Sequence, residues 1–257
     1  MNFDLTDEHR MVRDMVRKFA QEVIAPRGEE MERSGEYPYD IYAQMAELGL
    51  MGLPFPEEYG GSGGDWVALM LSIEEIARAD ITVAAMLEVT TAVAAQEIYA
   101  FGTDEQKRRW LTPLAKGTEI GAFGLTEPDA GSDAASLRTT ALLDGNEWVL
   151  NGSKQFITNI GLENASVLLT AAKLKTGRGQ FISTFIVPKD SPGFKLGKAY
   201  RKMAWHASAT HEVILEDCRI PKENILGNPE RGFSQHLAVL ETGRICLAAM
   251  AVGLAQA

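Results

Sequence analysis

The sequence predicts an α+β protein with an all-α N-terminal bundle, a β-rich middle part and a final helix. Three observations support this prediction. Apolar residues recur at helical spacing up to Gly117, and β-branched and aromatic runs then alternate with turn residues from Ile120 to about Leu226. Helical spacing returns from Gly232. The domain boundaries expected from these changes are 1–118, 119–228 and 229–257.

The N-terminal part divides into five expected helices. Thr6 is suited to cap the first helix, and Pro26 is expected to end it. Thr103 and Gln106 form a capping-box pair at the start of the fifth helix, which Gly117 closes. The second, third and fourth helices are expected over residues 39–48, 66–79 and 81–101.

The fourth of these segments is long and apolar enough to suggest a membrane span. It carries Glu88, Gln96 and Glu97, however, and carboxylates without partners are costly in hydrocarbon. We therefore expect a buried helix of a soluble bundle and no membrane association.

The middle part contains short strand candidates separated by turns. Asp144-Gly145 and Asn151-Gly152 are dipeptides typical of tight hairpins, and each separates two such candidates. Because short strands joined by tight turns favour antiparallel pairing, we expect an antiparallel barrel or sandwich rather than a parallel sheet. The later strand candidates are SVLLTAA, FISTFIVP and HEVILEDCRI.

Composition limits the function classes. The chain has 257 residues and a formal charge of −10, which argues against nucleic acid or an anionic membrane as partner. Two cysteines, Cys218 and Cys246, cannot form a disulfide framework, so a reducing compartment is expected. The N-terminus lacks the layout of a secretory signal.

Two patterns are not expected to carry chemistry. The run Gly60–Gly64 satisfies G-x-S-x-G, but that motif needs a strand before it, whereas prolines and glutamates precede it here. We expect a loop. His206 and His211 have no Cys or carboxylate cluster of metal spacing beside them, so no metal site is expected.

The most informative stretch is Gly124–Asp133, with the sequence GLTEPDAGSD. Small residues let backbone N–H groups approach a ligand, and the hydroxyls of Thr126 and Ser132 can donate to a heteroaromatic ring or a phosphate. A loop whose polar side chains satisfy its own turns has the same composition. Composition alone leaves both interpretations open.

Several motifs in one order resemble the acyl-CoA dehydrogenase family, and most closely its short-chain, butyryl-like subgroup. They are GLTEPDAGSDAAS, KQFITN, PEEYGGSGGD, KMAWHASAT, LEDCRIP and LETGRI. The resemblance covers the whole chain. It implies an N-terminal helical domain, a middle β-domain and a C-terminal four-helix domain, of which residues 229–257 would be only the first helix.

The resemblance also implies an FAD site. Thr126 would donate to the pyrimidine edge of the flavin, and Gly131 and Ser132 would meet the pyrophosphate. Many relatives carry Trp where Phe156 stands, so the flat apolar face is kept and the indole donor is absent. The flavin-binding set implied is Phe123, Leu125, Thr126, Gly131, Ser132, Phe156, Ile157 and Thr158.

The implied reaction is α,β-dehydrogenation of an acyl-CoA thioester, with the α-proton passing to a glutamate and the β-hydride to flavin N5. In most members that glutamate would lie beyond Ala257, and the branched-chain subgroup carries it at the position of Gly243, which cannot be a base. Glu241 points ~160° away from Gly243 around a helix, so it is not expected to replace it. No catalytic residue is therefore expected in these 257 residues, which alone should be inactive. The substrate-side residues implied are Ser132, Glu241, Gly243 and Arg244.

The implied partners are acyl-CoA, electron-transferring flavoprotein and further copies of the chain in a homotetramer. A bacterial cytoplasm or, as second choice, a mitochondrial matrix is the implied location. Two alternatives are a flavin oxidase or monooxygenase on the same fold, and a non-catalytic homologue that ends at Ala257 and binds a partner chain. Acyl-chain length and the choice between CoA and a carrier protein stay open.

Overall fold

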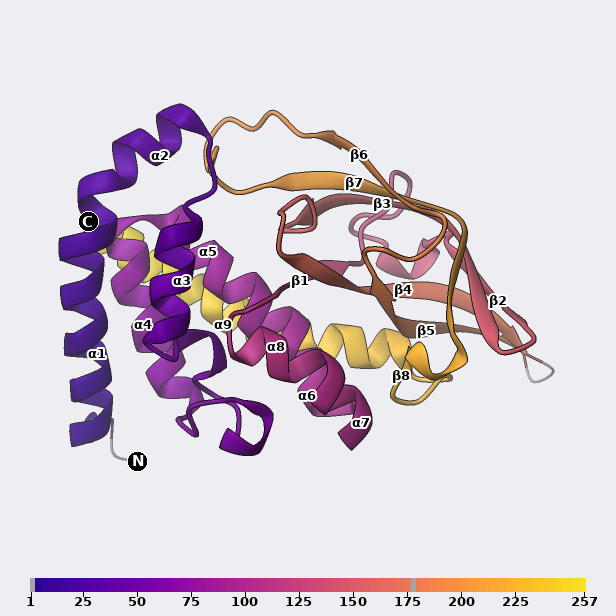
Figure 1. Ribbon diagram of the computed structural model, residues 1–257, viewed down its shortest axis with the longest axis horizontal. Coiled ribbons are helices and arrows are strands. Elements are labelled where there is room, and N and C mark those ends of the chain that lie inside the picture. Colours follow the sequence, from indigo (N-terminus) through magenta and orange to yellow (C-terminus); the bar gives the residue numbers. More distant parts are fainter. Residues whose placement is uncertain (1–2, 177–178) are drawn as a thin grey trace.

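The computed structural model describes residues 3–176 and 179–257, in which a helical part lies beside an open sheet (Figure 1). The helices are α1 (Asp7–Phe19), α2 (Gly28–Ser34), α3 (Tyr39–Glu47), α4 (Trp66–Ala79), α5 (Ile81–Glu88), α6 (Gln96–Phe101), α7 (Asp104–Gln106), α8 (Thr112–Ala115) and α9 (Gly232–Gln256). The strands are β1 (Ile120–Gly124), β2 (Thr140–Asp144), β3 (Glu147–Thr158), β4 (Ala165–Thr176), β5 (Gly179–Pro188), β6 (Phe194–Ala199), β7 (Thr210–Pro221) and β8 (Ile225–Leu226).

The first helix begins as expected and ends differently. The Thr6 hydroxyl accepts from the His9 backbone N–H at 3.1 Å, which caps α1. The prediction that Pro26 ends the helix is wrong, because helical turns continue through α2 to Gly35 at φ +68°. Pro26 lies in the first turn of a short 3-10 segment, where the backbone N–H that proline lacks needs no helical acceptor.

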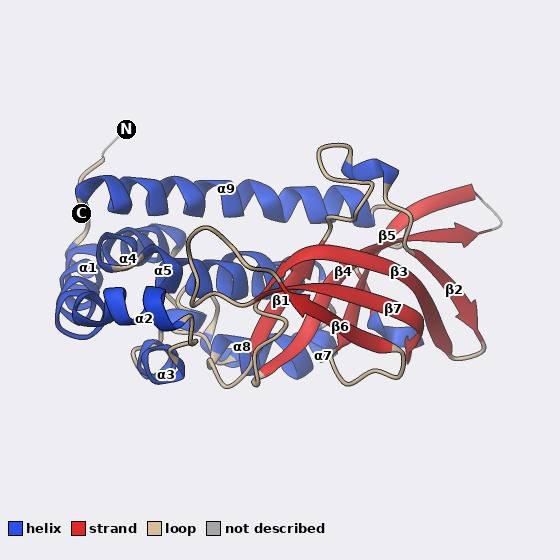
Figure 2. Cartoon of the chain, turned by 90° about the horizontal axis from the view of Figure 1, so that it is seen from above, coloured by secondary structure: helices blue, strands red, loops and turns tan. Residues whose placement is uncertain are grey.

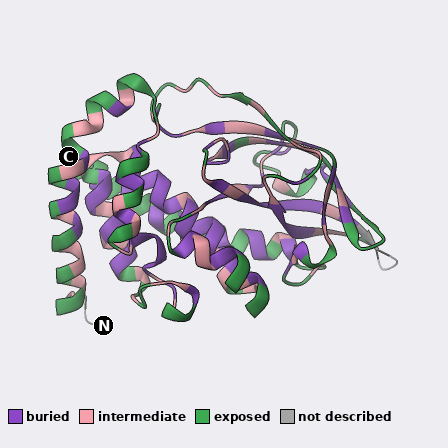
Figure 3. Cartoon of the chain, in the orientation of Figure 1, coloured by how far each residue is buried: buried purple, intermediate pink, exposed green. Residues whose placement is uncertain are grey.

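The apolar segment forms the centre of the helical part. α5, a π-helical stretch at Val89–Ala95 and α6 make one continuous helical run, which is largely buried (Figure 3). By length and composition, this run and α9 are each apolar enough to cross a membrane, and 83% of the candidate window in the run is buried inside the protein. Burial against the other helices accounts for its apolar composition.

The sheet differs from the predicted barrel or sandwich. The described strands form one eight-stranded open sheet in the order β6-β7-β3-β2-β4-β5-β8, with β1 also paired to β4. Most neighbours are antiparallel, but β1 and β2 both run parallel to β4, at residues 120–124 and 140–141. The sheet is therefore mixed. Turn signals identify only neighbours in sequence, so these two longer-range pairings were not predicted.

One of the two expected hairpins is present. Asp144 pairs with Glu147, so Gly145 and Asn146 form the turn between β2 and β3. The second expected turn is wrong, because β3 runs without interruption through Asn151 and Gly152. β7 bulges opposite this point, where the Asn151 amide bonds the side chain and backbone N–H of Asp217.

The final helix α9 crosses from the sheet to the helical part, as Figure 2 shows. At its start, Gly232 lies so close to β5 that a Cβ there would stand 2.5 Å from Ser183 Cα. Near its end, a Cβ on Gly253 would stand 2.2 Å from the Glu74 carbonyl oxygen of α4. Glycine at both positions lets α9 pack directly on the backbone of β5 at one end and of α4 at the other.

Candidate functional site

A cavity of about 280 Å³ lies where β1, β3, α5 and α9 converge. Six of the eight flavin-binding residues implied by the sequence line it: Phe123, Leu125, Thr126, Phe156, Ile157 and Thr158. The helices and β3 add lining residues that sequence reasoning did not single out: Glu88, Val89, Val93, Gln155 and Leu240. Two separate sequence motifs therefore meet on one side of the cavity, and helical residues face them.

An irregularity in β3 exposes the aromatic residue of the second motif. Between Lys154 and Ile157, β3 contains one residue more than the paired stretch of β7. Phe156 adopts φ +61°, a conformation that costs energy for a residue with a side chain. Its ring is 59% exposed, lies 4.9 Å from the ring of Tyr200 and presents a flat apolar surface beside the cavity.

A buried ion pair fixes the first motif against the second. Lys154 Nζ lies 2.7 Å from Glu127 Oε1 and 3.3 Å from the Leu125 carbonyl oxygen, and both charged side chains are almost fully buried. The carboxylate of Glu127 also accepts the backbone N–H groups of Arg138 and Thr139 and the Thr139 hydroxyl. These bonds determine the path of the loop that carries Thr126.

The electrostatics of this pair follow from its burial. Desolvation lowers the pKa of Lys154, although Glu127 opposes that shift. For Glu127, desolvation is outweighed by the charge and hydrogen bond of Lys154 together with the bonds from Thr139 and Arg138, so its pKa is lowered. The Gln155 backbone N–H donates to the Thr126 carbonyl at 2.9 Å and joins the two motifs a second time.

Gly131 and Ser132 lie outside this cavity. Both are exposed on the loop that follows Thr126. A Cβ on Gly131 would have no heavy atom within 4 Å, so the backbone here is open to a ligand. The structure thus places these two predicted residues on the exposed surface of the loop and not among the residues that line the cavity.

Among the predicted substrate-side residues of α9, one faces the cavity region. Gly243 is buried, and a Cβ there would lie 3.2 Å from Glu88 Oε1 and 3.4 Å from Val93 Cγ2. Glu241 and Arg244 are exposed on other faces of α9. Leu240, one helical turn before Arg244, lines the cavity instead.

Glu88 is a site residue that sequence reasoning missed. Its side chain lines this cavity and a second one of about 460 Å³, which also shares Val89, Phe156 and Thr158. Glu88 is 6% exposed, and burial raises its pKa to about 8. A carboxylate within an apolar run was visible in the sequence, but only packing shows which space it faces.

A second buried polar cluster packs against the ring of Phe123. His236 Nδ1 lies 2.5 Å from Glu97 Oε1 and 3.2 Å from the Thr184 hydroxyl, and all three side chains are fully buried. The Phe123 ring stacks on the His236 ring with centroids 4.2 Å apart. The cluster holds one wall of the cavity in place.

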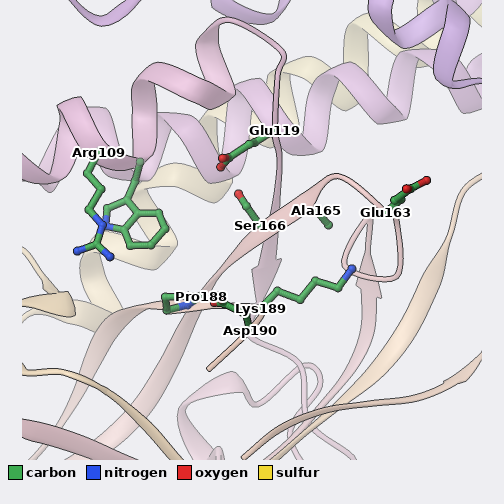
Figure 4. A pocket seen from close by; sticks show the side chains of 9 residues that line it. Arg109, Glu119, Glu163, Ala165, Ser166, Pro188, Lys189 and Asp190 are labelled. Carbon is green, nitrogen blue, oxygen red and sulfur yellow. The ribbon is translucent and has the colours of Figure 1, made fainter. Parts of the chain in front are cut away.

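Other hollows and motifs lie apart from this site. A surface hollow of about 660 Å³, lined by Arg109, Glu119, Lys189 and neighbours, shares no lining residue with the cavity (Figure 4). Within residues 3–176 and 179–257, no group of three or more His, Cys, Asp or Glu could hold a metal ion. Gly60–Gly64 is a loop, and the Ser62 hydroxyl in it donates to the Gly49 carbonyl at 2.8 Å.

Comparison with known proteins gives the family. The model for the N-terminal domain of acyl-CoA dehydrogenase matches residues 6–118, and that for the middle domain matches residues 122–218. A probable acyl-CoA dehydrogenase of Bacillus subtilis, YngJ, is 48% identical over all of this chain, which covers 68% of that protein. The chain belongs to the acyl-CoA dehydrogenase family, and it spans about two thirds of the length of this relative.

Solved structures agree with this assignment. Butyryl-CoA dehydrogenase from Megasphaera elsdenii superposes with a TM-score of 0.94 at 39% identity, and the match covers the whole chain and 68% of that structure. An acyl-CoA dehydrogenase from Bacillus anthracis complexed with FAD has a TM-score of 0.89 at 37% identity, covering 97% of this chain and 42% of that one. A structure described as an electron transferring flavoprotein of Acidaminococcus fermentans has a TM-score of 0.94 at 43% identity, covering 100% and 67%.

Proposed function

We propose that this chain carries the flavin- and acyl-CoA-binding parts of a short-chain acyl-CoA dehydrogenase. Its reaction is the α,β-dehydrogenation of an acyl-CoA thioester, with electron-transferring flavoprotein as acceptor and FAD as cofactor. The observation that carries the proposal is the convergence of Phe123, Leu125, Thr126 and residues 156–158 around one cavity. The proposed division of the chain is 1–118, 119–228 and 229–257.

The residues present fit FAD. The exposed face of Phe156 suits an aromatic ring, and Thr126 and Thr158 bring hydroxyl and backbone N–H donors to the cavity wall. The open backbone at Gly131, with Ser132 beside it, suits a pyrophosphate, which needs close approach of N–H groups. FAD held by these residues would supply the acceptor for the hydride equivalent of the β-carbon.

The chain's own residues bind and orient the substrate in this scheme. Val89, Val93 and Leu240 face the flavin-binding residues across the cavity and exclude water from the acyl chain. Water exclusion strengthens any hydrogen bond to the thioester carbonyl and raises the basicity of a carboxylate that takes the α-proton. We place that carboxylate outside residues 1–257, because Gly243 has no side chain. We place Ser132, Gly243 and Arg244 on the acyl-CoA side, and Glu241 at its margin.

The proposed assembly is a homotetramer in a bacterial cytoplasm. The exposed apolar side chains of α9, among them Ile245, Leu247 and Leu254, suit burial against further helices.

The proposal is tested by the visible spectrum of the protein expressed from its complete natural gene. Flavin bands that bleach on anaerobic addition of butyryl-CoA, and return with an electron acceptor, are the expected result. The 257-residue chain alone is expected to keep its flavin bands unbleached, because it lacks a positioned base. Flavin that never bleaches in the complete protein, with any acyl-CoA offered, contradicts the proposed function.

Gly131→Ala is expected to weaken FAD binding at least about tenfold while leaving the fold intact. The added methyl meets no protein atom within 4 Å, so the melting temperature of the apoprotein should change by less than about 1–2 °C. The same methyl stands where the pyrophosphate is proposed to contact the backbone. Fluorescence titration of the apoprotein with FAD measures the affinity, and Gly131→Ala with unaltered FAD affinity contradicts the placement.

A further inference from the structure

Glu88 is placed where a substrate chain leaves the reacting centre. It ends α5 at the start of the π-helical stretch Val89–Ala95, and its side chain lines both neighbouring cavities. Phe156 and Thr158 also line both, so the two spaces meet at the residues that we assign to the flavin. An acyl chain whose α- and β-carbons lie at the flavin therefore passes Glu88 when it continues into the second cavity.

The carboxyl group of Glu88 has no partner in the described part of the chain. Neither a hydrogen bond nor an ion pair to it is formed by residues 3–176 or 179–257, although it is 6% exposed. The side chain instead lines two cavities, so a ligand that enters either cavity can bond to the carboxyl. The group is therefore available to a substrate atom.

The surroundings indicate which kind of substrate atom fits. The second cavity is mainly apolar, with Ala85, Val89, Trp205 and Leu247 in its wall, which suits a short hydrocarbon chain. Arg201 and Lys202 line the same cavity and disfavour a cationic substituent. A hydroxyl group accepts from a protonated Glu88 and donates to an ionised one, so it satisfies the carboxyl in either state.

Gly243 supplies the room for this contact. Because a Cβ at this position would stand 3.2 Å from Glu88 Oε1, any larger side chain would compete for the space beside the carboxyl. The glycine of α9 and the glutamate of α5 thus form one local arrangement.

We propose that Glu88 is a specificity-determining residue that selects acyl-CoA substrates bearing a hydroxyl group beyond the β-carbon over plain hydrocarbon chains. This inference rests on the proposed function, since it concerns the acyl part of the same site. Glu88 takes no part in the bond-breaking steps; it binds the distal end of the chain.

The test compares 4-hydroxybutyryl-CoA with pentanoyl-CoA, which differ by a hydroxyl in place of a methyl group. Both the rate of anaerobic flavin reduction and the dissociation constant by calorimetry are measured, with the FAD-loaded protein from its complete gene. Wild type is expected to favour the hydroxyl substrate by tenfold or more in kcat/KM. Glu88→Leu is expected to lower that ratio 10- to 100-fold, and Glu88→Gln, which keeps hydrogen bonding, is expected to retain most of it.

Glu105→Leu, at an exposed glutamate on α7, is the matched control and should leave the ratio unchanged. Thermal unfolding checks that each variant is folded.

An unchanged ratio of kcat/KM values in Glu88→Leu, with both thioesters still reducing the flavin, overturns the inference and leaves the proposed function standing. Loss of flavin reduction by both thioesters in Glu88→Gln, with binding intact, also overturns it, because Glu88 then acts on the reacting carbons. If no thioester reduces the flavin of the wild-type protein, the proposed function fails. The ratio of the two dissociation constants, measured by calorimetry in wild type and Glu88→Leu, then still tests the role of Glu88.

Discussion

Replacing Lys154 with methionine is expected to lower the free energy of unfolding by about 3–5 kcal/mol. The substitution keeps most of the volume of the side chain but removes the cation that lies 2.7 Å from Glu127 Oε1. Glu127 is 5% exposed, so its carboxylate is left buried and must either stay unpaired or take up a proton. Equilibrium urea denaturation at pH 7 measures the loss.

Two further variants separate pairing from packing. Lys154→Met combined with Glu127→Leu is expected to recover part of the loss, because no charge is then left unpaired. Lys195→Met removes a partner from the exposed Lys195–Glu216 pair and should cost less than about 1 kcal/mol. A loss in Lys154→Met as small as that of the exposed pair is the result that contradicts this account.

Glu88→Gln is expected to remove a pH dependence of stability of about 3–5 kcal/mol. Burial raises the pKa of Glu88 to about 8 from an ordinary value of 4.5. The folded state therefore keeps a proton that the unfolded state releases, and the stability contributed by Glu88 is greatest below pH 4.5. That contribution falls as the pH rises from about 4.5 to about 8 and is constant above.

The measurement is the difference in unfolding free energy between wild type and Glu88→Gln across pH 5 to 9. Cys246 lies near Glu88, but its pKa is raised to about 12, mainly by burial, so its thiol stays neutral throughout. Glu105→Gln, on the surface, should leave the wild-type profile in place. If the difference in unfolding free energy between wild type and Glu88→Gln does not change with pH, the pKa of Glu88 is the same in the folded and unfolded states. That result contradicts the prediction.

Local signals predicted most of the helical part, apart from the helix end expected at Pro26. The cap at Thr6, the capping box of Thr103 and Gln106 and the left-handed glycine Gly117 each act within one turn of chain, so the sequence shows them directly. The barrel prediction failed for the opposite reason. The positions of β1 and β2 beside β4 depend on residues that are far apart in sequence, and no turn dipeptide records them.

The same distinction applies to the site. Residues in the two motifs, such as Thr126 and Phe156, were identified from short strings that resemble a family. Glu88 belongs to neither motif, and its importance follows from the packing of α5 against α9, where Gly243 leaves space beside it. An isolated carboxylate in an apolar run predicts burial or a functional role, and only the fold distinguishes between them.

The irregular stretch of β3 has a consequence for how this region can vary. In a regular strand, residues two apart share a face, yet Lys154 is fully buried whereas Phe156 is 59% exposed. The extra residue between Lys154 and Ile157 makes this possible, because it offsets the alternation of faces within the stretch. The number of residues in this stretch thus determines that Lys154 bonds to the loop of Leu125 and Glu127 while Phe156 lines the cavity. Removing or adding one residue in this stretch would therefore exchange the buried and exposed faces of the residues that follow it.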